Sequence, residues 1–362
     1  MDLLALKDKW ASLAVSSSAP WQDKNFGHLP GGRGNYPAVV IIMIVGADEP
    51  ERVREVLETL LANTRYPGWR IQLVDNACRP EVSQMLGIVP RASVLRNERR
   101  VSAPANRNKA FRATTADYFV CMDSDVLVRD PFWLHKLAAV AESDQRIGIV
   151  GGGLNSCGSF WWVNRDGVAR PSHFYFQKYV RQKPYECQVI QSHCALVRSE
   201  TLKQIGLFDE GFCPIYGEET DLCLRAVANN WRVFDTFLNV FHLGSRDTKS
   251  GLGRERALAL DMAGNRRVAL RWGGLLPNRP YSAYDSALTY LDHFRKNAPA
   301  ALPLMPALPP LTDENGEINA RFAVKTPTPG REHAGRKMIN LVKSAIKYFL
   351  LSACLRVRHE WR

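Results

Sequence analysis

Two aspartates separated by one residue, Asp123 and Asp125, are the strongest chemical signal in the sequence. They follow an apolar segment at 117–122 that has the pattern of a buried strand. Ligands of an open α/β sheet bind beyond the carboxyl ends of its strands, and carboxylate oxygens suit Mg²⁺ or Mn²⁺. The pair therefore predicts a divalent metal site that would neutralise a departing diphosphate. Solvated acids or helix caps at the end of a strand are the alternative interpretation.

A second acidic group, Glu218, Glu219 and Asp221, lies where a helix is expected to begin. A carboxylate in such a place can act as general base toward a hydroxyl nucleophile. The same three acids would also complement the positive end of the helix dipole, which is a purely structural role. His242 follows another strand-like segment, and it is either a structural histidine or a further metal ligand.

The elements that must position these side chains alternate between strand-like and helix-like patterns. Strand patterns occur at 38–45, 71–74, 93–95, 117–122 and 231–237, and helical spacing occurs at 53–61, 106–114, 132–142, 199–205, 220–228 and 257–272. Strands that alternate with helices are typical of an α/β fold with a mostly parallel sheet. We therefore expect such a sheet flanked by helices, with a helical extension at the C-terminal end.

The composition is that of an ordinary globular protein, with 46% hydrophobic and 23% charged residues. The longest apolar run has eight residues, at 38–45, far short of the about 20 that a membrane-spanning helix needs. The N-terminus lacks the pattern of a secretory signal. The eight cysteines are scattered without a Cys-x-x-Cys pair, so we expect reduced core thiols and a cytoplasmic protein.

The formal net charge of +12 is concentrated near the C-terminus. Residues 336–362 contain seven Lys or Arg and one Glu, and their apolar side chains fall mostly on one helical face. This predicts a basic amphipathic helix that packs on protein, on the same chain or on a second copy, or lies on an anionic membrane surface. We expect four segments: an extension at 1–36, the main domain at 37–275, a helix and Pro-rich tether at 276–335, in which the tether begins near 297, and the basic helix at 336–362.

The order of the motifs resembles that of the family 2 glycosyltransferases, which have the GT-A fold. The resemblance covers roughly residues 38–273. It rests on segments that are similar to motifs of that family, and the family's own motif is given after each segment in parentheses. The segments are 50–53 (Asn-Arg-Pro-Glu), 73–76 (Val-Val-Asp-Asn), 107–110 (Arg-Asn-x-Gly), 117–125 (Gly-Asp-Tyr to Asp-Ser-Asp), 194–198 with 206–210, 217–225 (Gly-Glu-Asp-x-Asp-Leu-Cys-Leu-Arg) and His242.

The resemblance implies an inverting transfer of a hexose or deoxyhexose from a UDP-, dTDP- or GDP-sugar, with Mn²⁺ or Mg²⁺ as cofactor. The acceptor would be a glycan or a lipid-linked glycan in polysaccharide assembly. The implied site residues are Asp125 and His242 on the metal, Asp123 near the ribose or the metal, Asp75 and Asp48 at the nucleoside, and Glu219 as base. Arg107 and Lys109 would hold the phosphates or, alternatively, lie on a solvated helix face.

The sequence departs from the family pattern at three of these positions. Residues 45–48 read Val-Gly-Ala-Asp in place of Pro-Thr-Tyr-Asn, and Ala110 replaces a glycine. Glu219 stands where the family has an aspartate, so Glu218 and Asp221 remain alternatives for the base. Aromatic residues at 156–162 and 173–176 would shape a sugar pocket or pack in the core.

Other classes of function fit the sequence less well. A sugar-phosphate nucleotidyltransferase would need a glycine-rich phosphate loop after the first strand, where Gly46 stands alone. A non-catalytic nucleotide-sugar binding module would not need the acids at 218–221. A nucleic-acid-binding protein would explain the net charge of +12, but half of that charge is terminal and no recognised binding motif is present, so we expect no nucleic-acid partner.

Overall fold

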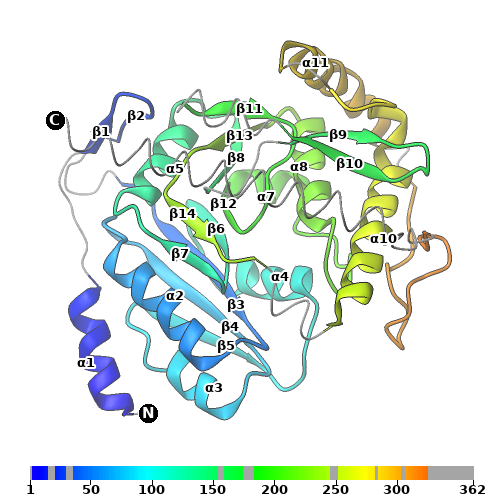
Figure 1. Cartoon of the computed structure of the whole chain (residues 1–362). Coiled ribbons are helices and arrows are strands. Elements are labelled where there is room, and N and C mark those ends of the chain that lie inside the picture. Colours follow the sequence, from blue (N-terminus) through cyan, green and yellow to red (C-terminus); the bar gives the residue numbers. More distant parts are fainter. Residues whose placement is uncertain are drawn as a thin grey trace, which may run out of the picture. The chain divides into compact units, whose positions relative to one another are not determined.

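An eight-stranded sheet forms the centre of the fold, with the strand order β11-β13-β8-β12-β6-β3-β4-β5 (Figure 1). β3, β4, β5 and β6 pair in parallel, as do β8 and β13, whereas β12 runs antiparallel to both β6 and β8. The strands are β3 (Val39–Val45), β4 (Arg70–Asn76), β5 (Ala92–Asn97), β6 (Tyr118–Asp123), β8 (Ile147–Gly152), β11 (Tyr185–Cys187), β12 (Cys194–Arg198) and β13 (Arg232–Thr236). The predicted mostly parallel α/β sheet is confirmed.

This computed structural model describes residues 2–14, 21–29, 36–153, 159–173, 183–244, 252–281, 284–302 and 306–324. The chain divides into two units, Met1–Val324 and Lys325–Arg362. The second unit, with the basic helix expected at 336–362, lies outside the described residues. The placement of the segment boundaries therefore stays a prediction.

Alternate side chains of β3 enter two different hydrophobic cores, one on each face of the sheet. Ile41 and Met43 belong to the first core, and Val40 and Ile42 belong to the second. The first core is covered by α1 (Leu3–Leu13), α2 (Pro50–Ala62), α3 (Pro80–Leu86) and α5 (Trp133–Glu142). The second is covered by α4 (Ala103–Ala113), α7 (Ser199–Ile205), α8 (Glu218–Ala228), α10 (Arg254–Trp272) and α11 (Tyr284–Ala301). Both faces of β3 are buried, which explains its unbroken run of apolar residues.

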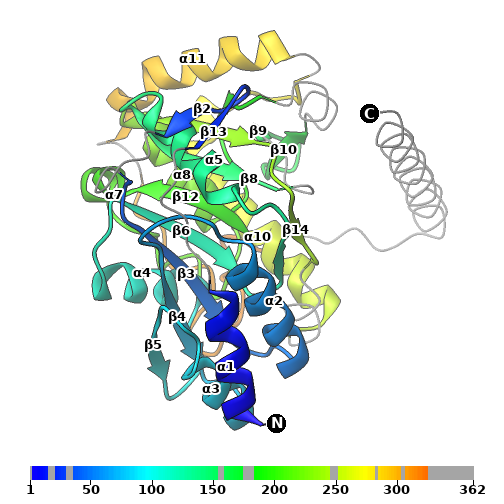
Figure 2. The same cartoon turned by 90° about the vertical axis from the view of Figure 1, so that its left-hand side faces the viewer.

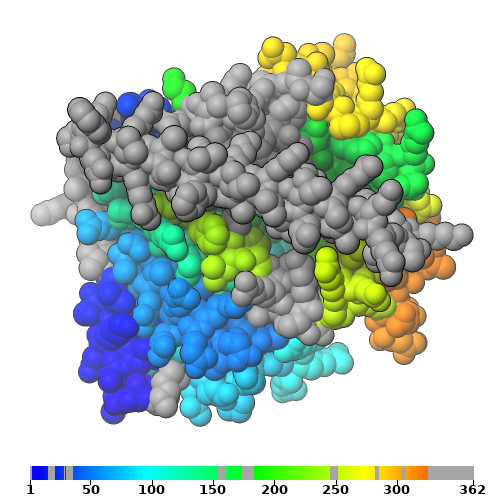
Figure 3. All heavy atoms as spheres, in the orientation of Figure 1, coloured from blue at the N-terminus to red at the C-terminus, as the bar shows by residue number. Residues whose placement is uncertain are grey.

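The N-terminal helix packs on the outside of the first layer of helices. Figure 2 shows α1 beside α2, and the Nζ of Lys9 lies 2.7 Å from a carboxylate oxygen of Glu58 in that helix. In the space-filling view, the atoms of these two helices form one continuous surface (Figure 3). Helix α1 thus belongs to the same compact unit as the large sheet.

Among the described residues, three short antiparallel pairs accompany the large sheet. They are β1 (Trp21–Asp23) with β2 (Gly27–Leu29), β9 (Ser159–Val163) with β10 (Ala169–His173), and β7 (Val126–Val128) with β14 (Val240–His242). The pair β7–β14 matters most for the site, because β7 follows Asp125 directly and β14 ends at His242.

The Pro-rich segment differs from the expected tether at its start. Helix α11 continues to Ala301, so the predicted beginning of the tether near 297 is wrong; the apolar side chains of Phe294 and Ala298 are buried and hold the helix on the sheet layer. Residues 306–324 then follow the surface of α10, where Leu311 and Phe322 are buried. No helix of the described residues is both long enough and apolar enough to cross a membrane.

The cysteines of the described residues are free thiols. Four are buried as expected of core thiols, namely Cys121, Cys187, Cys194 and Cys223, whereas Cys78 and Cys213 are half-buried. Two of the aromatic residues considered for a sugar pocket, Phe160 and Trp161, are buried in the second core, so they pack rather than line a cavity. Residues 156–158 and 174–176 lie outside the described residues.

Candidate active site

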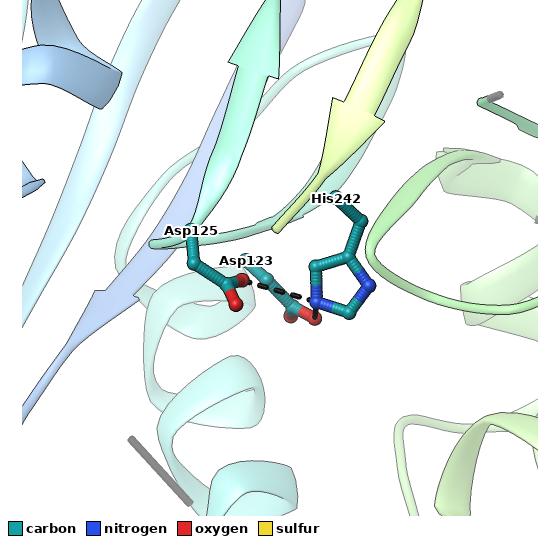
Figure 4. A group of neighbouring side chains, drawn as sticks. All are labelled: Asp123, Asp125 and His242. Atoms are coloured by element: carbon teal, nitrogen blue, oxygen red, sulfur yellow. Dashed lines mark ion pairs between the residues drawn. The ribbon is translucent and has the colours of Figure 1, made fainter. Parts of the chain in front are cut away.

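Two aspartates and a histidine meet at the carboxyl end of β6 (Figure 4). Asp123 ends β6, and Asp125 follows after one residue, immediately before β7. Because β14 pairs with β7 in a register that sets His242 opposite Val126, the histidine is brought back across the two acids. The short β7–β14 ribbon therefore explains how residues separated by more than a hundred positions reach the same place.

The donor atoms of this group are spaced as a metal site requires. His242 Nε2 lies 3.1 Å from Asp125 Oδ1 and 3.7 Å from Asp123 Oδ2, and all three donor atoms fall within 4.8 Å of one another. An octahedral ion with oxygen ligands at about 2.1 Å has neighbouring ligands about 3 Å apart. Two carboxylates and one imidazole thus fit a divalent ion such as Mn²⁺ in both geometry and ligand chemistry.

A second histidine, His193, packs against the three candidate metal ligands Asp123, Asp125 and His242, which together are called the metal group. Its ring stacks on that of His242 with 4.8 Å between centroids and 7° between planes. Its backbone carbonyl accepts a hydrogen bond of 3.1 Å from the amide of Asp123. His193 was not predicted from the sequence. It stands directly before β12, and it reaches the metal group because β12 runs antiparallel to β6, with Cys194 opposite Met122.

These side chains line a cavity of about 630 Å³, within the size range of small-molecule sites. Of the predicted site residues, the cavity wall includes Asp48, Arg107, Asp123, Asp125, Glu218, Glu219 and His242. The structure thus brings the metal group and the two glutamates of α8 into one space.

Asp75 is held away from the cavity wall. Its carboxylate accepts hydrogen bonds from the amide of Cys78, at 2.9 Å, and from the hydroxyl of Ser83. Burial favours the neutral acid, but these hydrogen bonds and nearby Arg96 hold the pKa of Asp75 below its usual range. The next residue, Asn76, lines the cavity instead, so a role for Asp75 at a nucleoside base stays a prediction.

Asp48 is hydrogen-bonded to the loop that follows β6. Its two carboxylate oxygens each lie 3.0 Å from the donating hydroxyl of Ser124, between the two metal-group aspartates. The amide of Gly46 donates a further hydrogen bond of 3.1 Å to Asp48. The loop after β3 and the loop after β6 are therefore tied together at the cavity wall.

The guanidinium of Arg107 forms ion pairs with carboxylates of the protein itself. Its guanidinium lies 2.8 Å from Glu218 Oε1 and 3.5 Å from Asp123 Oδ1, and it donates to the hydroxyl of Ser192 at 3.2 Å. Nearby Lys109 donates to Asn97 Oδ1 at 2.7 Å and does not line the cavity. A phosphate-binding role for either cation stays a prediction, and the geometry favours a positioning role for Arg107.

The three acids at the start of α8 have different surroundings. Asp221 is fully buried, with ion pairs to Arg225 at 2.9 Å and Arg271 at 2.8 Å and a hydrogen bond from the indole of Trp272 at 3.0 Å. Burial alone would raise the pKa of Asp221, but the two guanidiniums hold it below its usual range. Asp221 is therefore a structural ion-pair partner and does not line the cavity.

Glu218 and Glu219 both line the cavity, and within the described ranges of the chain only Glu218 has an ion-pair partner. Glu218 is 1% exposed; its Oε1 is bound to Arg107, and its Oε2 is buried with no partner among the described residues. Glu219 is half-buried. Burial and the adjacent charge of Glu218 raise the pKa of Glu219 well above its ordinary value, and Arg107 offsets this only in part. A carboxylate with a raised pKa is a stronger proton acceptor once ionised.

Comparisons with known proteins agree with this geometry. Residues 40–206 match the family described as Glycosyl transferase family 2. The chain is 28% identical over 217 residues to the O-antigen biosynthesis protein RfbC of Myxococcus xanthus, a match that covers 54% of this chain and 16% of the relative. It is 24% identical over 225 residues to the uncharacterized protein y4gI of Sinorhizobium fredii (strain NBRC 101917 / NGR234), covering 56% and 24% of the two chains.

A solved structure shares the fold. The crystal structure of GalNAc-T7 with UDP, GalNAc and Mn²⁺ superimposes with a TM-score of 0.54 and 13% identity, covering 83% of this chain and 62% of that chain. The fold is the GT-A fold of nucleotide-sugar glycosyltransferases. Residues 40–206 belong to glycosyl transferase family 2.

Proposed function

We propose that the chain transfers a sugar from a nucleoside-diphosphate sugar to a hydroxyl of a glycan or lipid-linked glycan, with inversion at the anomeric carbon. The observation that carries this proposal is the shared cavity, in which Asp123, Asp125 and His242 adjoin the glutamates of α8. Asp125 and His242, with Asp123, would hold Mn²⁺ or Mg²⁺, which supplies neutralisation of the diphosphate charge. The GalNAc-T7 structure, which contains UDP and Mn²⁺, supports this assignment.

Glu219 is the general base of the proposed reaction. Its carboxylate removes the proton of the acceptor hydroxyl while that oxygen forms a bond to the anomeric carbon. The bond from the anomeric carbon to the diphosphate oxygen breaks on the opposite side, and the nucleoside diphosphate leaves. A single displacement of this kind inverts the configuration. Asp48 and Arg107 position the cavity walls around the donor: Asp48 through its hydrogen bond with Ser124, and Arg107 through its ion pair with Glu218.

The acceptor class is supported by the similarity to an O-antigen biosynthesis protein. Two further predictions go with a lipid-linked acceptor: docking of residues 336–362 on an anionic membrane, and a place on the cytoplasmic side of that membrane. Truncation after Gly330 should abolish binding to vesicles that contain anionic lipid, while turnover of soluble substrates is retained. Unchanged vesicle binding would refute the docking.

The function is tested by thermal shift with UDP-, GDP- and dTDP-sugars in the presence of Mn²⁺ or Mg²⁺, because a bound ligand stabilises the folded state. Nucleotide release is then measured for the donor that stabilises the protein. Asp125→Ala and Glu219→Gln should each lower the rate by about 10²–10⁴. The matched control is Asp166→Ala, an exposed aspartate outside the cavity. Near-normal turnover by both variants would refute the assignment.

A further inference from the structure

The cavity that contains Glu219 is also lined by residues that have no role in the proposed reaction. Tyr216, in the loop before α8, and Asp261, on α10, both line it, and Ile215 and Leu252 add apolar surface. Burial, together with the charges of Asp261, Glu218 and Glu219, raises the pKa of Tyr216 to about 12. The phenol therefore lies within electrostatic reach of all three carboxylates.

A glycine allows α10 to approach this wall so closely. A Cβ atom added at Gly264 would lie 2.3 Å from the backbone oxygen of Tyr216, far inside contact distance. Asp261 precedes Gly264 by three residues and therefore lies on the same side of the helix. The contact at Gly264 thus sets Asp261 beside Tyr216 at the edge of the cavity.

The carboxylate of Asp261 is oriented but still accessible. It accepts a hydrogen bond from Asn265 Nδ2 at 3.0 Å, and Arg170 Nη1 lies 3.7 Å from its other oxygen. Its side chain is 40% exposed. An ionised carboxylate has about four acceptor positions, so positions remain for the hydroxyl groups of a ligand.

We propose that Tyr216 and Asp261 form the acceptor subsite and select a neutral sugar ring. This inference rests on the proposed function, because it assumes that the hydroxyl deprotonated by Glu219 belongs to the molecule bound here. Asp261 accepts hydrogen bonds from ring hydroxyls, and the apolar side chains and the phenol ring contact the face of the sugar.

The charge of the wall gives the selectivity. Glu218, Glu219 and Asp261 contribute three carboxylates to the cavity wall. Arg107 is paired with Glu218 and Arg170 with Asp261, and Arg100 also lines the cavity. An acidic sugar or a phosphate placed here would meet like charges at close range, which disfavours its binding. A neutral hexose carries hydroxyl donors and no charge.

The test measures binding of simple glycosides to the full chain with Mn²⁺ and UDP, by saturation-transfer NMR followed by titration. The probes are the methyl glycosides of glucose, galactose and mannose, and methyl glucuronide as the acidic counterpart. We expect at least one neutral glycoside to bind, and methyl glucuronide to bind more weakly than methyl glucoside. Asp261→Asn should weaken neutral binding about tenfold and reduce the discrimination against the glucuronide.

The control is Asp285→Asn, an exposed aspartate of α11 outside the cavity, which should bind all probes as the unmodified chain does. The proposal is overturned if no neutral glycoside binds, if the glucuronide binds as well as the glucoside, or if Asp261→Asn binds every probe normally. Mn²⁺-dependent nucleotide release reports the proposed function separately. If the unmodified chain releases nucleotide with Mn²⁺ but the glycosides do not bind as expected, this inference alone is refuted.

Discussion

The guanidinium of Arg107 and the carboxylate of Glu218 meet at 2.8 Å, although 111 residues separate them in the sequence. The same guanidinium lies 3.5 Å from Asp123 of the metal group. Arg107 thus connects α4 with the start of α8 and with the end of β6. A single buried cation fixes the relative positions of the metal group and the acid pair.

The first prediction concerns the pH dependence of turnover. Glu219 accepts a proton only when ionised, so its raised pKa should make the rate fall as the pH drops through that pKa. Glu218→Gln removes the adjacent negative charge, lowers the pKa of Glu219 and should move the acidic limb of the kcat/KM profile to lower pH. Glu200→Gln, at an exposed position of α7, should leave the profile unchanged. If the acidic limb of the kcat/KM profile does not move in Glu218→Gln, the charge of Glu218 does not raise the pKa of the group that acts as base.

The second prediction tests whether Asp221 has a structural role and is not the general base. Asp221→Asn leaves Arg225 and Arg271 without their buried carboxylate, so the free energy of unfolding should fall by about 3–5 kcal/mol. Denaturant unfolding measures this loss, and Asp285→Asn should change it by less than about 0.5 kcal/mol. If Asp221→Asn unfolds like the unmodified chain but has lost turnover, Asp221 acts in catalysis instead.

The third prediction concerns support of the metal group. His193→Ala removes the ring that stacks on His242, and the freed imidazole should bind Mn²⁺ about tenfold more weakly. Titration calorimetry with Mn²⁺ gives the affinity directly. His293→Ala, at an exposed site of α11, is the matched variant and should bind Mn²⁺ normally. Equal affinities for the two variants would show that the stacking is incidental.

The fourth prediction uses two glycines. Gly264→Ala places a methyl group against the backbone oxygen of Tyr216, so we expect a loss of about 1–3 kcal/mol in stability and weaker acceptor binding. Gly274→Ala is the control, because a Cβ there meets nothing within 4 Å. Unfolding curves and glycoside titrations of the two variants should differ; if they coincide, α10 is not held by this contact.

Much of the fold was predictable because its strands and helices carry clear local patterns. Residues 38–45 and 199–205 were predicted almost to the residue as β3 and α7. The metal group was predictable as well, since Asp123 and Asp125 follow a strand and His242 completes a recognisable motif. Their meeting within 4.8 Å is what those patterns imply.

The remaining features depend on long-range pairing, which local patterns do not encode. His193 became part of the site through the antiparallel register of β12 with β6, and nothing in residues 191–194 indicates that direction. Asp221 and Glu219 were indistinguishable as candidate bases until Arg271, 50 residues further along, was found beside Asp221. Tyr216 and Asp261 were missed because one belongs to a loop and the other to a helix beyond the motifs.

The reversed direction of β12 also limits where the chain can tolerate change. The first residue of β12, Cys194, follows His193, which lines the cavity. The last residue, Arg198, lies at the other end of the strand and leads directly into α7, where the amide of Ser199 donates a hydrogen bond to the carbonyl of Asp117, just before β6. Residues inserted ahead of the strand would reshape the chamber that receives the substrates. Residues inserted behind it would separate β12 from α7, whose first residues Ser199 and Thr201 are buried, so changes of specificity are better introduced on the cavity flank.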